Sequence, residues 1–178
     1  MLRLLKNIFR KRCLKREKSS SRTGIVPPES IDSAVALLDG DGDGLQECTE
    51  AVSDFFKEYG IRGRIILLDL KSSRKDGEAF DGTTVKSDDV NWYGRPCTSV
   101  TGQTEMNGRG LFLSLTDSRS FTAEYLAKCS GAIFKIGRRQ LPGDTFDLVI
   151  KENGETRASQ AEIFREILSM LKKIKACR

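Results

Sequence analysis

The sequence predicts an α/β protein: a three-layer Rossmann-like or flavodoxin-like domain with a mainly parallel sheet, preceded by a basic N-terminal helix. Short continuous apolar runs, which suit strands buried on both faces, alternate along the chain with amphipathic stretches of helical spacing. The first 22 residues hold nine Lys or Arg against one Glu, a balance of +8 in a chain of net charge +5. A mildly acidic body of charge −3 therefore follows a basic arm.

Length and composition favour one domain. With 178 residues, 38% of them apolar and 31% charged, the chain is long enough for a single core. We expect an arm over residues 1–22, a linker over 23–30 and a single α/β domain over 31–178. No stretch approaches the roughly 18 apolar residues that span a bilayer, and no secretory signal develops. Five dispersed Cys without a Cys-x-x-Cys pair indicate free thiols and a cytoplasmic protein, with the inner face of the membrane as an alternative location.

The arm is expected to begin as a helix. One face of that helix is apolar and the other faces are basic, the apolar residues being Leu4, Leu5, Ile8 and Phe9. Such a helix attracts polyanions, either nucleic acid or an anionic membrane surface. Alternatively, its apolar face packs on the C-terminal helix and leaves the charges in solvent. The residues expected to contact nucleic acid or membrane are Arg3, Lys6, Arg10, Lys11, Arg12, Lys15, Arg16 and Lys18.

The first half of the domain contains one βαβ unit. Residues 34–38 are a short apolar run that ends at an Asp-Gly pair. Residues 45–59 repeat apolar side chains at helical spacing and stop at Gly60. Residues 64–70 contain a continuous apolar core, which suits a second strand buried on both faces. The second half repeats the alternation, in the order strand 111–115, helix 118–129, strand 132–136, a turn at 141–144, strand 146–150 and helix 158–175. This order implies a mainly parallel sheet with helices on both faces.

Residues 71–110 form the least regular stretch, and a crossover this long is either functional or contains a further element. Its one compact signature is Asn-Trp-Tyr-Gly-Arg-Pro at residues 91–96. Trp92 and Tyr93 either pin the crossover to the core or contact a ligand or partner at the carboxyl edge of the sheet. Arg138, with Lys135 and Arg139, forms a second basic cluster, which is either a solvated strand end or an extension of a polyanion-binding surface. The residues considered for a ligand or partner contact are Asn91, Trp92, Tyr93, Arg95 and Arg138.

Several of these segments resemble a family of small conserved bacterial proteins of unknown function. The similarity covers most of the chain and is sharpest at residues 91–96, at Phe-Lys-Ile-Gly-Arg (134–138) and at Phe-Asp-Leu-Val-Ile (146–150). In that family a basic N-terminal helix precedes a Rossmann-like domain. The resemblance implies the same architecture here and brings no catalytic residues with it.

The acidic segment at residues 39–50 allows three interpretations. Its acids at positions 1, 3 and 5, Gly at 6 and Glu at 12 have the spacing of a calcium-binding loop, although no second loop accompanies it. The same acids resemble the Asp-x-Asp opening of haloacid-dehalogenase-like phosphatases, in which a carboxylate attacks phosphate beside Mg²⁺, although the Thr that follows this opening is missing. The third interpretation is a solvated turn in which Asp43 caps the following helix. The candidate metal ligands are Asp39, Asp41, Asp43 and Glu50.

The element before this segment distinguishes the interpretations. A helix over residues 29–38 would favour calcium, whereas a strand over residues 33–38 would favour the turn or the phosphatase.

The absence of His from the sequence excludes Ser-His and Cys-His nucleophile pairs and His metal ligands. We therefore expect a non-enzymatic binding or regulatory module, whose arm is directed at RNA or the ribosome and whose body meets a protein partner. No cofactor is expected. The alternatives are a peripheral membrane-surface protein, which attaches through the arm, and a protein that binds Ca²⁺ or hydrolyses phosphate esters with Mg²⁺ or Ca²⁺ through the acidic loop.

Overall fold

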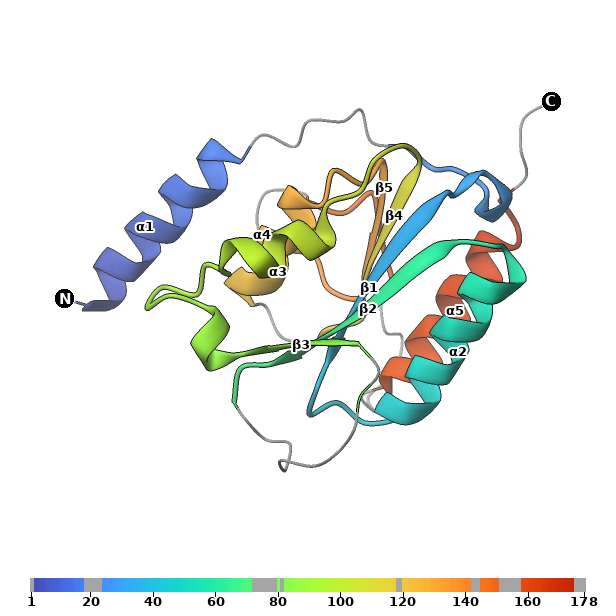
Figure 1. Ribbon diagram of the computed structural model, residues 1–178, viewed down its shortest axis with the longest axis horizontal. Coiled ribbons are helices and arrows are strands. Elements are labelled where there is room, and N and C mark those ends of the chain that lie inside the picture. Colours follow the sequence, from blue (N-terminus) through green and yellow to red (C-terminus); the bar gives the residue numbers. More distant parts are fainter. Residues whose placement is uncertain are drawn as a thin grey trace.

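The computed structural model describes residues 2–17, 24–71, 80, 82–117, 120–141, 145–150 and 158–174. It confirms the α/β class, the parallel sheet and the N-terminal helix. Six parallel strands form one sheet with helices on both faces, and helix α1 (Leu2–Arg16) lies outside one of the two helix layers (Figure 1). The strand order β3-β2-β1-β4-β5-β6 is the Rossmann order, and not that of flavodoxin.

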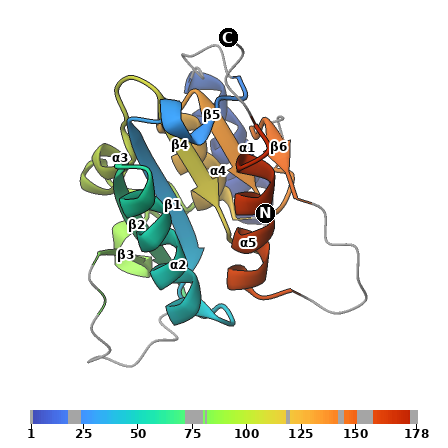
Figure 2. The same ribbon diagram turned by 90° about the vertical axis from the view of Figure 1, so that its right-hand side faces the viewer.

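The predicted strands and helices occur in the predicted order, with β3 and α3 as additional elements. The strands are β1 (Ser33–Asp39), β2 (Arg62–Asp69), β3 (Thr83–Lys86), β4 (Gly110–Ser114), β5 (Phe134–Gly137) and β6 (Leu148–Val149). The helices are α2 (Leu45–Glu58), α3 (Thr98–Thr104), α4 (Phe121–Cys129) and α5 (Gln160–Leu171), with short 3₁₀ turns at Pro28–Ser30 and Ser87–Asp89. Helices α2 and α5 lie side by side on one face of the sheet, which Figure 2 turns toward the viewer, and α3 and α4 cover the other face.

The two faces of β1 build two separate cores. All seven residues of β1 are buried, because the strand lies in the middle of the sheet between β2 and β4. Ala34, Ala36 and Leu38 pack toward α2 and α5, whereas Val35 and Leu37 pack toward α3 and α4. A strand with two dry faces needs apolar residues at every position, which explains why its sequence is a continuous apolar run.

The long crossover contains two elements that the sequence analysis did not predict, β3 and α3. Strand β3 is a four-residue edge strand, and only Val85 in it is fully buried. Helix α3 has the polar sequence Thr-Ser-Val-Thr-Gly-Gln-Thr, which carries no apolar stripe. Strand β6 is shorter than predicted, because Phe146 packs into the core beside Gly137 and only two residues pair with β5.

The helix ends are set by local capping. Helix α5 begins after Ser159, whose hydroxyl accepts a hydrogen bond from the Glu162 N–H (3.2 Å) while the Glu162 carboxylate accepts one from the Ser159 N–H (2.7 Å). The prediction that Asp43 caps α2 is wrong: the residue at the N-cap is Gly44, with φ 71°, and no side chain caps the helix. Residues 118–119, 142–144 and 175, which belonged to predicted elements, lie outside the described residues.

Gly63 is required by close packing between β2 and α2. A Cβ at this position would lie 1.9 Å from the ring of Phe56, which is buried. We expect Gly63→Ala to lower the free energy of unfolding by about 1–3 kcal/mol, the usual effect of overpacking. Gly102→Ala, in α3 where nothing lies near the new methyl group, is the control and should raise the stability by roughly 0.5–1 kcal/mol. Urea unfolding measures both, and an unchanged midpoint for Gly63→Ala would contradict this packing.

Candidate functional site

Helix α1 is docked on α4 and on the turn formed by residues 91–96. Cys13 of α1 is buried in a small apolar cluster with Phe121 and Tyr125 of α4, and Tyr93 from the turn packs against the same cluster. Helix α4 covers the face of the sheet opposite to α5. The alternative that the arm packs on the C-terminal helix is therefore wrong.

Polar contacts fix the docked helix. The Arg10 Nε donates a hydrogen bond of 2.7 Å to the carbonyl oxygen of Tyr93, and the Arg10 guanidinium carbon lies 5.1 Å from the centre of the Phe121 ring. About two turns further along, directly after the last residue of α1, Glu17 accepts a 2.9 Å hydrogen bond from the Tyr125 hydroxyl. Burial lowers the pKa of Arg10, so that its partners must compensate for lost hydration. Arg10 is thus half-buried against the body and does not belong to the exposed cations of α1.

The signature segment owes its shape to Asn91 and Gly94. The Asn91 side-chain oxygen accepts hydrogen bonds from the N–H groups of Tyr93 (3.2 Å) and Arg95 (2.9 Å), which closes the turn. Gly94 has φ 97°, a conformation that favours glycine. Its carbonyl oxygen accepts a 2.8 Å hydrogen bond from the Thr122 hydroxyl of α4. The turn is therefore a rigid part of the body that presents the Tyr93 carbonyl to α1.

Arg95 and Trp92, which were considered for a ligand contact, lie in different surroundings. Arg95 donates a hydrogen bond of 3.1 Å from its Nε to the Tyr125 hydroxyl. Burial and the bond to Glu17 raise the pKa of Tyr125, so it keeps its proton and can donate to Glu17. Trp92 does not pin the crossover to the core, because 54% of its surface is exposed and its ring lies edge-on to Phe9 at 5.3 Å.

The outer surface of α1 changes character along its length. The row Leu4, Ile8, Arg12, Arg16 has i, i+4 spacing, so its first half is apolar and its second half is basic. We call the apolar end the apolar tip; its side chains are the exposed Leu2, Leu4, Leu5 and Ile8, with Phe9 at its boundary. The exposed cations of the described helix are Arg3, Lys11, Arg12, Lys15 and Arg16, while Lys6 is half-buried. Lys18 lies outside the described residues.

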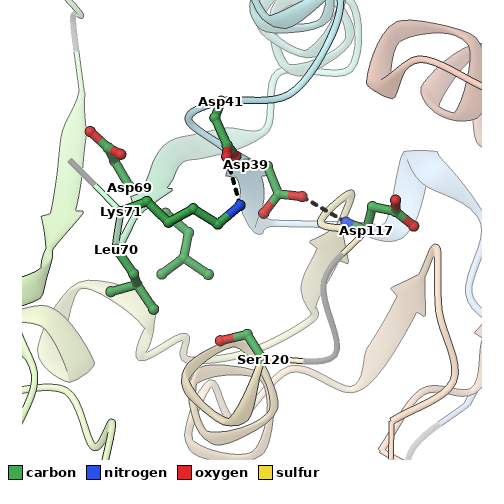
Figure 3. A pocket seen from close by; sticks show the side chains of 8 residues that line it. Asp39, Asp41, Asp69, Leu70, Lys71, Asp117 and Ser120 are labelled. Carbon is green, nitrogen blue, oxygen red and sulfur yellow. Dashed lines mark hydrogen bonds and ion pairs between the residues drawn. The ribbon is translucent and has the colours of Figure 1, made fainter. Parts of the chain in front are cut away.

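A pocket of about 370 Å³ opens at the carboxyl edge of the sheet (Figure 3). Asp39 lies at the end of β1, Asp69 at the end of β2, and Asp117 follows β4. The neighbours β1 and β4 mark the point where the strand order reverses, which is where open α/β sheets bind ligands. The pocket is lined by Asp39, Asp41, Leu68, Asp69, Leu70, Lys71, Asp117 and Ser120.

Asp39 is held on both its backbone and its side chain. Its carboxylate accepts a 2.7 Å hydrogen bond from the Asp117 N–H, and the Gln160 amide pairs with the Asp39 backbone N–H (2.8 Å) and carbonyl (3.1 Å). Burial raises the pKa of Asp39, and the nearby charges of Asp41 and Asp117 raise it further. Asp41 itself forms a 3.0 Å ion pair with Lys71. The pocket therefore contains a carboxyl group that is costly to ionise.

The candidate metal ligands divide between the pocket and the surface. Asp39 and Asp41 line the pocket, whereas Asp43 and Glu50 are exposed and are not among its lining residues. A strand precedes Asp39, as the turn and phosphatase interpretations require, and not the helix of a calcium-binding loop. Among the described residues, no three His, Cys, Asp or Glu side chains are grouped so that they could hold a metal ion.

Two acids of the pocket, Asp69 and Asp117, were not singled out from the sequence. The available signal was their position at or close to the carboxyl ends of predicted strands, since these ends meet at one edge of a parallel sheet.

The second basic cluster lies mostly inside the protein. Arg138 is only 4% exposed and its Nε lies 3.9 Å from the Asp117 carboxylate, while the Arg139 Nε donates a 2.6 Å hydrogen bond to the same oxygen. Lys135 is also buried, and burial lowers its pKa. The interpretation of this cluster as a solvated strand end is therefore wrong for Lys135 and Arg138. The two Arg side chains instead neutralise Asp117 beside the pocket.

These features define a Rossmann-ordered α/β protein with a basic helix docked on one helix layer and a carboxylate-lined pocket at the carboxyl edge of its sheet. Residues 2–174 match DUF6913, a family of unknown function, and the chain belongs to this family. The expectation of an uncharacterised family is thereby confirmed. No curated protein and no solved structure matches the chain. In the part of the chain that the structure describes, no helix has both the length and the apolar character needed to cross a membrane.

The raised pKa of Asp39 leads to a prediction about stability. Because the folded state binds this proton more tightly than the unfolded state, stability is lost as the pH rises through the folded-state pKa. Asp39→Asn keeps an oxygen for the Asp117 N–H without the charge, and we expect it to raise the free energy of unfolding at pH 7. The gain should vanish below the ordinary pKa of Asp, where both states are protonated. Urea unfolding at the two pH values measures this.

Asp43→Asn provides the control for that measurement, because Asp43 is exposed on the same loop and does not line the pocket. It should change the stability little at either pH. A gain for Asp39→Asn that is equally large in acid would show that the charge of Asp39 is not its cause.

Proposed function

We propose that this protein is a peripheral membrane-surface module, which attaches to anionic lipid through the outer surface of α1. The single observation that carries the proposal is the exposed apolar tip, which continues into exposed cations on a helix whose other side is docked on the body. Apolar side chains followed by Lys and Arg are the pattern of helices that bind in the interface of a bilayer.

The aliphatic side chains distinguish lipid from RNA as the partner. Binding to RNA or the ribosome, which the sequence first favoured, depends on the cations, because phosphate contacts come from Lys and Arg. Leu4 and Ile8 add nothing to such contacts, yet both are exposed on the outer surface of α1. Contiguous exposed apolar surface is unusual on a protein that has no partner for it. An anionic membrane uses both the cations and the aliphatic side chains.

The energies are sufficient for reversible attachment. Each Lys or Arg held near an anionic bilayer contributes roughly 1 kcal/mol, and full burial of a Leu or Ile side chain contributes about 1.5–3 kcal/mol. Leu2 and Leu4 keep 76% and 69% of their surface in water, so most of this burial remains available on a membrane. The sum offsets the loss of freedom on binding without approaching the strength of a membrane-spanning helix.

Co-sedimentation with vesicles tests the proposal. The chain should bind phosphatidylglycerol vesicles, bind phosphatidylcholine vesicles weakly, and dissociate as salt is raised. The double variant Leu4→Ser/Ile8→Ser should lower the partition coefficient by at least about tenfold, because two aliphatic groups no longer enter the lipid. Ile25→Ser is the matched control, since Ile25 is an exposed aliphatic residue outside α1. It should bind as the parent chain does.

The same proteins distinguish RNA from lipid. The membrane proposal is wrong if neither protein sediments with vesicles while both bind RNA equally well and with a steep salt dependence. That result would support an arm directed at RNA.

Metal-assisted hydrolysis of phosphate esters is a second candidate, favoured by the position of Asp39 and Asp41 in a pocket at the strand-order reversal. Mg²⁺ takes one or two carboxylates and fills its remaining positions with water and substrate phosphate. In this reaction the ionised carboxylate of Asp39 would attack phosphorus, and the bond from phosphorus to the alcohol oxygen would break so that the alcohol leaves as its oxyanion. Water would then hydrolyse the aspartyl phosphate, which restores Asp39 and releases inorganic phosphate.

Turnover of p-nitrophenyl phosphate with Mg²⁺ tests this second candidate. We expect Asp39→Asn to abolish turnover, because the amide is no nucleophile, and Asp43→Asn to retain it. Absence of Mg²⁺-dependent turnover in the parent chain across a panel of phosphate monoesters would remove hydrolysis as a function of this pocket.

A further inference from the structure

The turn at residues 91–96 places an aromatic side chain beside the apolar tip. Trp92 is 54% exposed, although Trp is a residue that normally gains from burial. Its ring meets Phe9 edge-on at 5.3 Å, and Phe9 is itself 43% exposed. Phe9 therefore covers only part of the Trp92 ring.

The exposed apolar surface of α1 runs continuously to this turn. Leu2, Leu5 and Phe9 have i, i+3, i+7 spacing, so they follow one another along one side of the helix. The last of them touches Trp92. Leu4 and Ile8 flank this row, which makes the surface wider than a single stripe.

Helix and turn are held in one orientation. Asn91 closes the turn with two hydrogen bonds to backbone N–H groups, and Thr122 fastens Gly94 to α4. Arg10 then joins α1 to the carbonyl oxygen of Tyr93. The position of Trp92 relative to the apolar tip is thus determined before any partner binds, which lowers the entropy cost of engaging both together.

We propose that Trp92 enters the headgroup region of an anionic bilayer together with the apolar tip, while α1 stays docked on the body. The turn and the helix then form one membrane-binding surface, with Trp92 as the anchor at its edge. Indole suits this place because its ring is apolar and its N–H finds an acceptor at the lipid–water boundary. Exposed Arg12 and Arg16, further along α1, match the negative charge of the lipid. This inference rests on the proposed function.

The chain contains a single Trp, so its fluorescence reports this residue alone. On phosphatidylglycerol vesicles the Trp92 emission should shift to shorter wavelength. Lipids brominated near the headgroup should quench it more strongly than lipids brominated at the end of the acyl chain, because the residue lies at the boundary. Trp92→Ser should weaken vesicle binding by about tenfold, the equivalent of roughly 1.4 kcal/mol.

Arg10→Ala tests the requirement for docking. Loss of the bonds to Tyr93 and the Phe121 ring should release α1, so that vesicles still sediment the chain through the arm while the quenching of Trp92 falls. Circular dichroism confirms that this variant is folded.

The outcomes separate the inference from the function on which it rests. If vesicles sediment the parent chain but its Trp92 emission is neither shifted nor quenched, or if Trp92→Ser binds undiminished, the inference is overturned and the membrane function stands. If the parent chain does not sediment with anionic vesicles, both fail. The emission measurement uses the parent chain, so it is independent of whether any variant folds.

Discussion

The contact between Arg10 and the turn determines which parts of this protein face outward. A charged guanidinium leaves water only when an acceptor and a polarisable surface replace its hydration, and the Tyr93 carbonyl and the Phe121 ring provide them. With Arg10 turned inward, helical periodicity places Leu4 and Ile8 on the outward side, about 120° and about 160° away around the axis. The exposure of the apolar tip is therefore a consequence of how α1 docks, and the docking depends on a turn closed by Asn91.

The two candidate sites share one connection of the fold, the segment that joins β4 to α4. Asp117 in this segment donates its N–H to Asp39, and Ser120, at the N-cap of α4, lines the pocket. The next two residues belong to α4. The Phe121 ring contacts the Arg10 guanidinium of α1, and the Thr122 hydroxyl donates a hydrogen bond to the Gly94 carbonyl oxygen. Ser120 also lines a smaller opening between α1 and α4. A movement of the N-terminus of α4 would therefore affect both the pocket and the docked helix.

The sequence predicted those parts of the structure whose cause is local. Continuous apolar runs marked β1 and the second half of β2, because both faces of the sheet are dry there, and apolar residues at helical spacing marked α1. It did not predict β3 and α3, since a four-residue edge strand and a polar helix are stabilised by tertiary contacts that no periodicity records. In the sites, Asp39 and Asp41 were visible as neighbours. The contact of Arg10 with the turn could not be predicted. Seven cations of α1 look alike in the sequence, and only the docked structure shows that Arg10 faces the body.

Two features of the chain do not favour its folding, and both lie where function is proposed. Leu4 and Leu5 remain in water on a protein with buried cores on both faces of its sheet, and Asp39 is buried where its charge is unfavourable. The fold requires neither feature. Other exposed positions of α1 carry Lys or Arg, so Leu4 and Leu5 could be polar. Gln160 holds the backbone of Asp39, so this contact does not need the Asp39 carboxylate. Sequences keep such locally unfavourable residues mainly where they act on something else. The apolar tip would be stabilised where aliphatic groups leave water and neighbouring cations meet negative charge. The interface of an anionic bilayer provides both conditions.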